Sequence, residues 1–224
     1  MPRPLYRPGH RGLPASRHRD TEARAAARLA HPSIVAIYDT CSEDGNEAIV
    51  MELVRGNTLR DRLDEGPIDP WAAANIAAQV AGALDVAHAA GLVHRDIKPA
   101  NIRIDSEGHA RIMDFGVAHL ATSNLTGTGV MMGTPNYMAP EQITSGDVTA
   151  ATDIFSVGAV LYELLTNLKP FAADTLHRVL FRIVSDPPPD LLATAPDLPP
   201  ALDKVVKKAL ATDVANRYSS ATEM

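Results

Sequence analysis

The stretch HRDIKPANIRIDSEGHARIMDFG at 94–116 constrains the fold most, because it sets charged and amide side chains between short β-branched runs. It follows an apolar helix expected over 69–90, which an Asp-Pro pair opens as N-cap and first helical residue. Two short strands are expected at 101–105 and 110–113, separated by the turn SEGH. A long helix, a charged loop and two short strands therefore follow one another directly.

The remaining chain adds strands before this stretch and helices after it. We expect a short helix at 21–30, strands at 33–39 and 48–54 around the turn 42–47, a helix at 57–64, a long loop at 117–148, and helices at 150–167, 174–184 and 200–210. Two early strands followed mostly by helices predict an α+β fold with a large helical part.

Charge is unevenly distributed. The net charge is −6, yet residues 1–19 carry five Arg and no acid, so 16 basic and 27 acidic residues remain over 20–224, a net −11. The start is expected to be a disordered basic leader, and the acidic remainder argues against nucleic-acid binding. The single Cys41 allows no internal disulfide, and no secretory signal or membrane segment is evident, which favours a cytoplasmic protein.

Four side chains in and after the charged loop suit phosphate chemistry. Asp96 can take a proton from a hydroxyl, and Lys98 can reach a phosphate. Asn101 and Asp114 carry the hard oxygen ligands that Mg²⁺ prefers. Singly, each residue has an ordinary structural explanation, so the interpretation depends on the whole set.

Five motifs in fixed order resemble the eukaryotic-type serine/threonine protein kinase family, in particular its bacterial branch, over roughly 21–224. They are HRDIKPAN (94–101), MDFG (113–116), GTPNYMAPE (133–141), TDIFSVG (152–158) and the arginine of NRY, Arg217. The resemblance implies a kinase-like α+β fold that transfers the γ-phosphate of ATP to protein Ser or Thr hydroxyls.

The resemblance also implies roles for single residues. Asp96 would be the catalytic base, Lys98 would mark Ser/Thr specificity, and Thr134 would bridge these two side chains. Asn101 and Asp114 would hold Mg²⁺ next to ATP.

On the adenine side, the resemblance makes Met51 the gatekeeper and turns the Glu52 carbonyl and the Val54 amide toward the base. Arg103 stands where relatives place an apolar residue under adenine. Its guanidinium could stack on the ring, or the side chain could turn to solvent. Either alternative puts adenine binding in doubt.

Regulatory and structural residues follow from the same resemblance. Arg95 beside the base suggests activation by phosphorylation of the following loop, with Thr126 and Thr128 as the modified residues. Four further positions would be structural: Glu22 as the partner of a strand lysine, Glu141 and Arg217 as an ion pair, and Asp153 as the anchor of the catalytic-loop backbone.

Two family features are missing from this sequence. It has no G-x-G-x-x-G loop, and its first lysine is Lys98, so Glu22 has no strand lysine to pair with. Active kinases need that Lys–Glu pair. We therefore expect a kinase domain cut at both ends, with a basic leader (1–19), a remnant of the small lobe as helix plus hairpin (20–54) and a largely complete helical lobe (55–224).

Two functions remain open from the sequence. The first is a Ser/Thr kinase using ATP and Mg²⁺ on protein substrates, with possible self-phosphorylation through a dimer, although the chain as written is expected to be inactive or nearly so. The second is a pseudokinase that acts as a protein-binding module, which the missing lysine and Arg103 favour.

Overall fold

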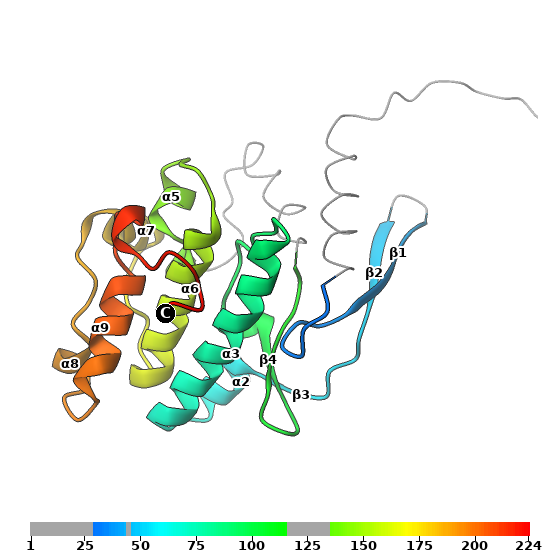
Figure 1. Cartoon of the computed structure of the whole chain (residues 1–224). Helices are drawn as coiled ribbons and strands as arrows, with labels where there is room; N and C mark the ends of the chain where they lie inside the picture. Colours follow the sequence, from blue (N-terminus) through cyan, green and yellow to red (C-terminus); the bar gives the residue numbers. More distant parts are fainter. Residues whose placement is uncertain (1–28, 44–45, 116–134) are drawn as a thin grey trace, which may run out of the picture.

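The computed structural model describes residues 29–43, 46–115 and 135–224 (Figure 1). The described chain begins with an antiparallel hairpin of β1 (Ile37–Glu43) and β2 (Asn46–Met51), which lies to one side of the helical part. The hairpin was predicted, but its strands extend into the expected turn at 42–47 and β1 begins later than the run 33–39. Glu22, Thr126, Thr128 and Thr134 lie outside the described residues.

The start of that β-branched run pairs elsewhere. Ile34 forms a parallel bridge with Ile112, supported by hydrogen bonds from Val35 N to the Ile112 carbonyl and from Ile112 N to the Ser33 carbonyl. These contacts tie the segment before the hairpin to a different sheet, which explains why β1 starts late.

That second sheet has the order β3–β4–β5, from Gly56–Thr58, Ile102–Asp105 and Ala110–Ile112. Strands β4 and β5 were predicted, whereas β3 was missed and its residues were assigned in part to a helix. Gly56 has a φ of 132°, and a Cβ there would overlap the Ile104 carbonyl oxygen. Only glycine therefore fits this close strand pairing.

Helices make up the rest of the described chain. They are α2 (Leu59–Asp64), α3 (Pro70–Ala89), α5 (Pro140–Ile143), α6 (Ala150–Thr166), α7 (Leu176–Ser185), α8 (Leu191–Thr194) and α9 (Pro200–Ala209), with 3₁₀ turns η1 (Pro99–Asn101), η2 (Pro135–Tyr137) and η3 (Val214–Asn216). The expected loop 117–148 was too long, because its described end contains η2 and α5. Pro140 opens α5 as its first helical residue.

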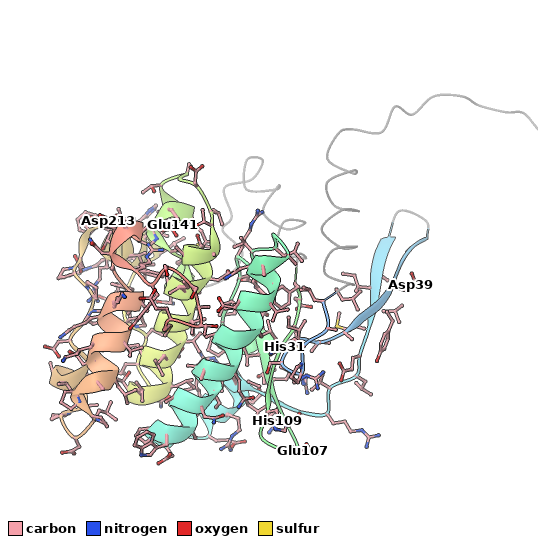
Figure 2. The ribbon with its side chains drawn as sticks, in the orientation of Figure 1. His31, Asp39, Glu107, His109, Glu141 and Asp213 are labelled. Atoms are coloured by element: carbon pink, nitrogen blue, oxygen red, sulfur yellow. The ribbon has the colours of Figure 1, made fainter. Side chains whose placement is uncertain are left out.

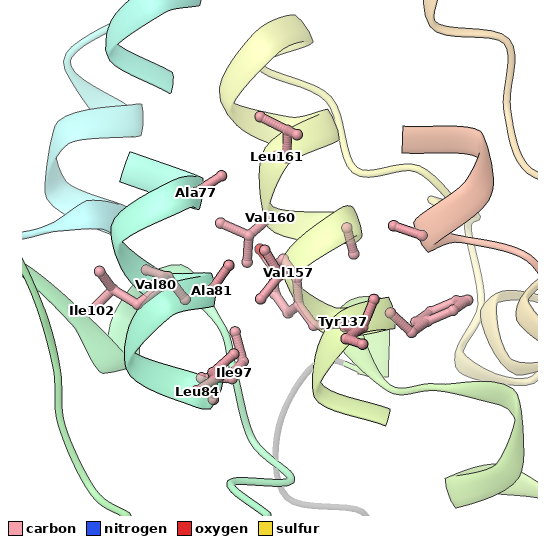
Figure 3. Packing of buried hydrophobic residues seen from close by; sticks show 14 of the residues in the cluster. Ala77, Val80, Ala81, Leu84, Ile97, Ile102, Tyr137, Val157, Val160 and Leu161 are labelled. Atoms are coloured by element: carbon pink, nitrogen blue, oxygen red, sulfur yellow. The ribbon is translucent and has the colours of Figure 1, made fainter. Parts of the chain in front are cut away.

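The core lies where α3 packs along α6 (Figure 3). Helix α3 turns small residues such as Ala77 and Ala81 toward Val157 and Val160 of α6. Helix α6 is buried along Thr152–Leu164, so it is the central helix of the body rather than a surface helix. Residues placed at the start of α6 are therefore held rigidly.

Close packing on the other side of α6 generates a stability prediction. A Cβ at Gly158 would meet the Ala209 Cβ of α9 at 2.7 Å. Gly158→Ala should lower the free energy of unfolding by about 1–3 kcal/mol through overpacking. The control Gly82→Ala in α3, where a Cβ meets nothing within 4 Å, should leave stability unchanged or raise it by up to about 1 kcal/mol. Urea unfolding of both variants measures this, and equal effects would contradict the packing argument.

Candidate active site

The loop between α3 and η1 is anchored by Asp153 in the first turn of α6. Its carboxylate accepts hydrogen bonds from the backbone N–H groups of His94 and Arg95, both at 2.8 Å, and lies 2.7 Å from His88 Nε2. The Asp153 side chain is fully buried. Backbone donors and the positive end of the helix dipole offset the cost of burying this charge. The loop is thereby fixed to the central helix.

Arg95 shows why such an anchor is needed. Its φ is 69°, a left-handed conformation that costs a non-glycine residue about 1–3 kcal/mol. Besides the bond to Asp153, its carbonyl accepts a hydrogen bond from Gln142 Nε2 of α5 at 2.9 Å. Its Nε is buried and has no hydrogen-bond acceptor within the described part of the chain. The guanidinium thus keeps unused donor capacity.

Asp96 lies at the centre of the loop with its carboxylate 40% exposed. Lys98 Nζ approaches Asp96 Oδ2 at 2.7 Å, and Asn101 Nδ2 donates to the same oxygen at 2.9 Å. Asn101 also donates to the Asp96 carbonyl at 2.9 Å, which fixes backbone and side chain together. A part-exposed ion pair adds at most about 1 kcal/mol to stability. The arrangement orients an accessible carboxylate more than it stabilises the fold.

His94 connects the loop to the DFG segment. The Asp96 N–H donates to His94 Nδ1 at 3.2 Å, so this nitrogen acts as an acceptor and Nε2 carries the proton. His94 Nε2 then donates to the Met113 carbonyl at 2.9 Å. The ring also packs edge-on against buried Phe115, with centroids 4.7 Å apart. His94 therefore joins the two segments through a hydrogen bond and a ring contact.

Asn101 and Asp114, the predicted metal ligands, come from these joined segments. The Met113 N–H donates to the Asn101 carbonyl at 2.9 Å, directly before Asp114 in the chain. Asp114 has a φ of 62° and is exposed. One amide oxygen and one exposed carboxylate suit Mg²⁺, which is bound through few protein groups together with phosphates.

Glu141 and Arg217 form a buried bidentate ion pair, with both N–O distances at 2.8 Å. Arg217 also donates to three backbone carbonyls, and Thr152 Oγ1 donates to Glu141 at 2.8 Å. Burial alone would raise the pKa of Glu141, but the hydrogen bonds from Arg217 and Thr152 outweigh it and hold the pKa below its ordinary value. Figure 2 shows Glu141 near Asp213, on the side of the body away from the hairpin.

The residues predicted to face adenine lie where β2 leads into β3. Met51 ends β2 and is half-buried, and Val54 is buried. The Glu52 N–H donates to the Ala36 carbonyl at 2.8 Å, so the residue after β2 is still hydrogen-bonded to the segment before β1. The Arg103 guanidinium donates to the Gly56 carbonyl of β3, the strand that pairs with β4.

One buried network was missed by the sequence analysis. Arg60 of α2 donates to Tyr137 at 2.7 Å and to Glu163 of α6 at 2.8 Å, and Tyr137 donates to Glu163 at 2.5 Å. Burial is the larger cause and the hydrogen bond to Glu163 the second cause that raise the pKa of Tyr137 above its ordinary value. Arg60 and Glu163 lie 103 residues apart, so no local sequence pattern could reveal the network.

Comparisons with known proteins agree with this geometry. Residues 13–224 match the family described as protein kinase domain. The chain belongs to the protein kinase family. Among its relatives is the serine/threonine-protein kinase PknL of Mycobacterium tuberculosis, 40% identical over 205 residues, which cover 91% of this chain and 51% of PknL.

Two further relatives extend the comparison. PknD of M. tuberculosis is 41% identical over 206 residues and PknB of Mycolicibacterium smegmatis 42% over 211, covering 91% of this chain and 31% and 34% of the relatives. The chain therefore spans 31% to 51% of the length of these relatives. Its α+β architecture and its place in the bacterial Ser/Thr kinase group are confirmed. Among the described residues, no helix is both long and apolar enough to span a bilayer.

The buried ion pair predicts a pH-dependent loss of stability. Removing one partner of a buried pair strands the other charge, so Glu141→Gln should cost about 3–5 kcal/mol at neutral pH. Since folding lowers the pKa of Glu141, its contribution is present above the ordinary value of 4.5 and is lost as the pH falls from there through the folded value.

Urea unfolding of the wild type and of Glu141→Gln, measured from pH 7 to pH 3, tests this prediction. The wild type should lose stability more steeply below pH 4.5 than Glu141→Gln. The control Glu107→Gln, an exposed residue of the β4–β5 turn, should follow the wild type. Parallel pH profiles for wild type and Glu141→Gln would contradict the assignment.

Proposed function

We propose that this chain carries the catalytic centre of a serine/threonine protein kinase, which transfers the γ-phosphate of ATP to Ser or Thr hydroxyls of proteins. One observation carries the proposal: an accessible Asp96 carboxylate oriented by Lys98 and Asn101 on a loop fixed to α6. The relatives PknL, PknD and PknB are serine/threonine-protein kinases, which supports the same chemistry.

In the proposed reaction, a substrate hydroxyl oxygen attacks the γ-phosphorus, forming a new O–P bond as the bond to the ADP oxygen breaks. Asp96 receives the proton of the hydroxyl, and Lys98 contacts the transferring phosphate. Thr134 would bridge Asp96 and Lys98. The protein thus contributes positioning and charge, which is what phosphoryl transfer requires.

Magnesium fits the residues present. Asn101 and Asp114 would hold it, and bound Mg²⁺ neutralises negative charge on the phosphates. The hydrogen bond from Met113 to the Asn101 carbonyl supports this role, because it keeps the two ligand-bearing segments together. Adenine would lie against Met51, the Glu52 carbonyl and the Val54 amide. Arg103 is unfavourable there because it places a cationic side chain where the base needs an apolar surface.

Regulation by loop phosphorylation is part of the proposal. The buried Arg95 Nε has no acceptor among the described residues, and a phosphate on Thr126 or Thr128 would supply charged oxygens for such an arginine. Self-phosphorylation through a dimer in the cytoplasm fits this scheme. The domain limits at 19/20 and 54/55 remain predictions of the same kind.

The chain as written should be inactive or nearly so. No lysine precedes Lys98 in this sequence, so Glu22 has no strand lysine to pair with and no such lysine contacts the ATP phosphates. The same absence, together with Arg103, favours the second candidate function, a protein-binding module built on the helical lobe.

Long incubation of the 224-residue chain with Mg-ATP and casein tests the proposal. Mass spectrometry should find slow phosphate transfer to Ser or Thr, well below the ordinary kinase rate of about 1–100 s⁻¹. Asp96→Ala should reduce the rate by a further ~10²–10⁴-fold because the base is lost.

The matched control is Asp197→Ala, which removes an exposed carboxylate between α8 and α9 and should change nothing. Transfer that survives Asp96→Ala would contradict the assigned base. A complete lack of transfer by the folded wild type would favour the binding module.

A further inference from the structure

Strands β4 and β5 carry opposite chemistry on their two faces. Ile102 and Ile112, directly paired, are fully buried in the core. Successive strand residues point to opposite faces, so the neighbouring pair Arg103 and Arg111 lies on the other face. Two cationic side chains are thus directly opposite each other on the face turned away from the core.

Both arginines hold the segment that links β2 to β3. Arg111 pairs with the Glu52 carboxylate at 2.6 Å, and that carboxylate also accepts from the Ala36 N–H at 3.3 Å. Arg103 donates to the carbonyl of Gly56, where the linker ends and β3 begins. Arg111 therefore holds the start of linker 52–55, and Arg103 holds the β3 residue that follows its end.

The fastening has an energetic cost. Like charges directly opposite in a strand pair repel each other. The Nε of Arg103 and the Nε of Arg111 are both buried without an acceptor in the described part of the chain, and a buried donor without a partner destabilises the fold. The two arginines therefore do not add to stability as an apolar pair would.

Under the proposed function, the adenine base must lie between the linker backbone at 52–54 and the β4 residue at position 103. Arg103 donates from β4 to the carbonyl of Gly56, the β3 residue directly after this linker, so a base placed against residue 103 would meet its guanidinium. A purine offers an apolar face, and placing it there would break the contact with Gly56 and leave a part-buried guanidinium without an acceptor.

We propose that Arg103 is a specificity-determining residue that weakens adenine-nucleotide binding, because its guanidinium is held against β3 on the face of β4 that the base would contact. The inference rests on the proposed function, because it takes ATP as the ligand. It assigns weak nucleotide binding to one side chain of β4.

Isothermal titration of the full chain with Mg-ADP tests the inference. Arg103→Leu should lower the Kd for ADP at least tenfold, since the base gains an apolar surface and no hydrogen bond must break. Arg103→Lys, which keeps a cation, should bind as weakly as the wild type. Arg178→Leu, at an exposed site on α7, is the matched control and should leave the Kd unchanged.

Thermal unfolding checks that each variant is folded, and Arg103→Met replaces Arg103→Leu if the branched side chain prevents folding. Equal or weaker ADP binding by the folded variant, including a lack of binding by both proteins, would overturn the inference. Because ADP donates no phosphate, that result would leave Asp96-dependent transfer untouched. If Arg103→Leu binds ADP more tightly but phosphate transfer does not depend on Asp96, the proposed mechanism is contradicted. The inference about Arg103 would then still hold.

Discussion

The buried carboxylate of Asp153 is the interaction on which the candidate active site depends. It binds two consecutive backbone N–H groups, those of His94 and Arg95, and so imposes a conformation that Arg95 would avoid in isolation. Removing an ion from water costs several kcal/mol, and here that cost is met by neutral donors and a helix dipole. The result is a loop whose shape is set by the central helix rather than by its own sequence.

Helix α6 can serve as this reference point because it is buried on all sides. Small residues of α3 allow close approach on one side, and Gly158 allows α9 to approach on another. The Glu141–Arg217 pair then ties α5 to the segment after η3, and Thr152 of α6 bonds to the same carboxylate. The loop, the segment before Phe115 and the helical core therefore form one connected structure.

Local chemistry made much of this predictable. The capping pair Asp69-Pro70 indicated the start of α3, and motif spacing indicated the candidate site before any geometry was known. Strand β3 was missed because its three residues carry no periodicity and its pairing depends on a glycine that approaches Ile104. The partners of Arg60 and Arg103 also escaped the sequence, since both are contacts between segments far apart in the chain.

The adenine side and the phosphate side of the site differ in character. Around Asp96, each contact joins complementary groups and leaves the carboxylate accessible. Around Arg103 and Arg111, cations face each other and two buried donors lack acceptors in the described structure. These contacts favour the proposed phosphate chemistry at Asp96 and disfavour the proposed adenine contact at Arg103.

The central claim, that Asp153 fixes the loop, is tested most directly by residue-resolved amide hydrogen exchange. The N–H groups of His94 and Arg95 should be protected in the wild type and lose at least ~10-fold protection in Asp153→Asn, about 1.4 kcal/mol, because the charge and one acceptor oxygen are lost. In Asp203→Asn, which removes the carboxylate that accepts from Leu191 N, protection at His94 and Arg95 should be unchanged. Exchange at these two amides that is fast in the wild type, or equal in wild type and Asp153→Asn, would contradict the account.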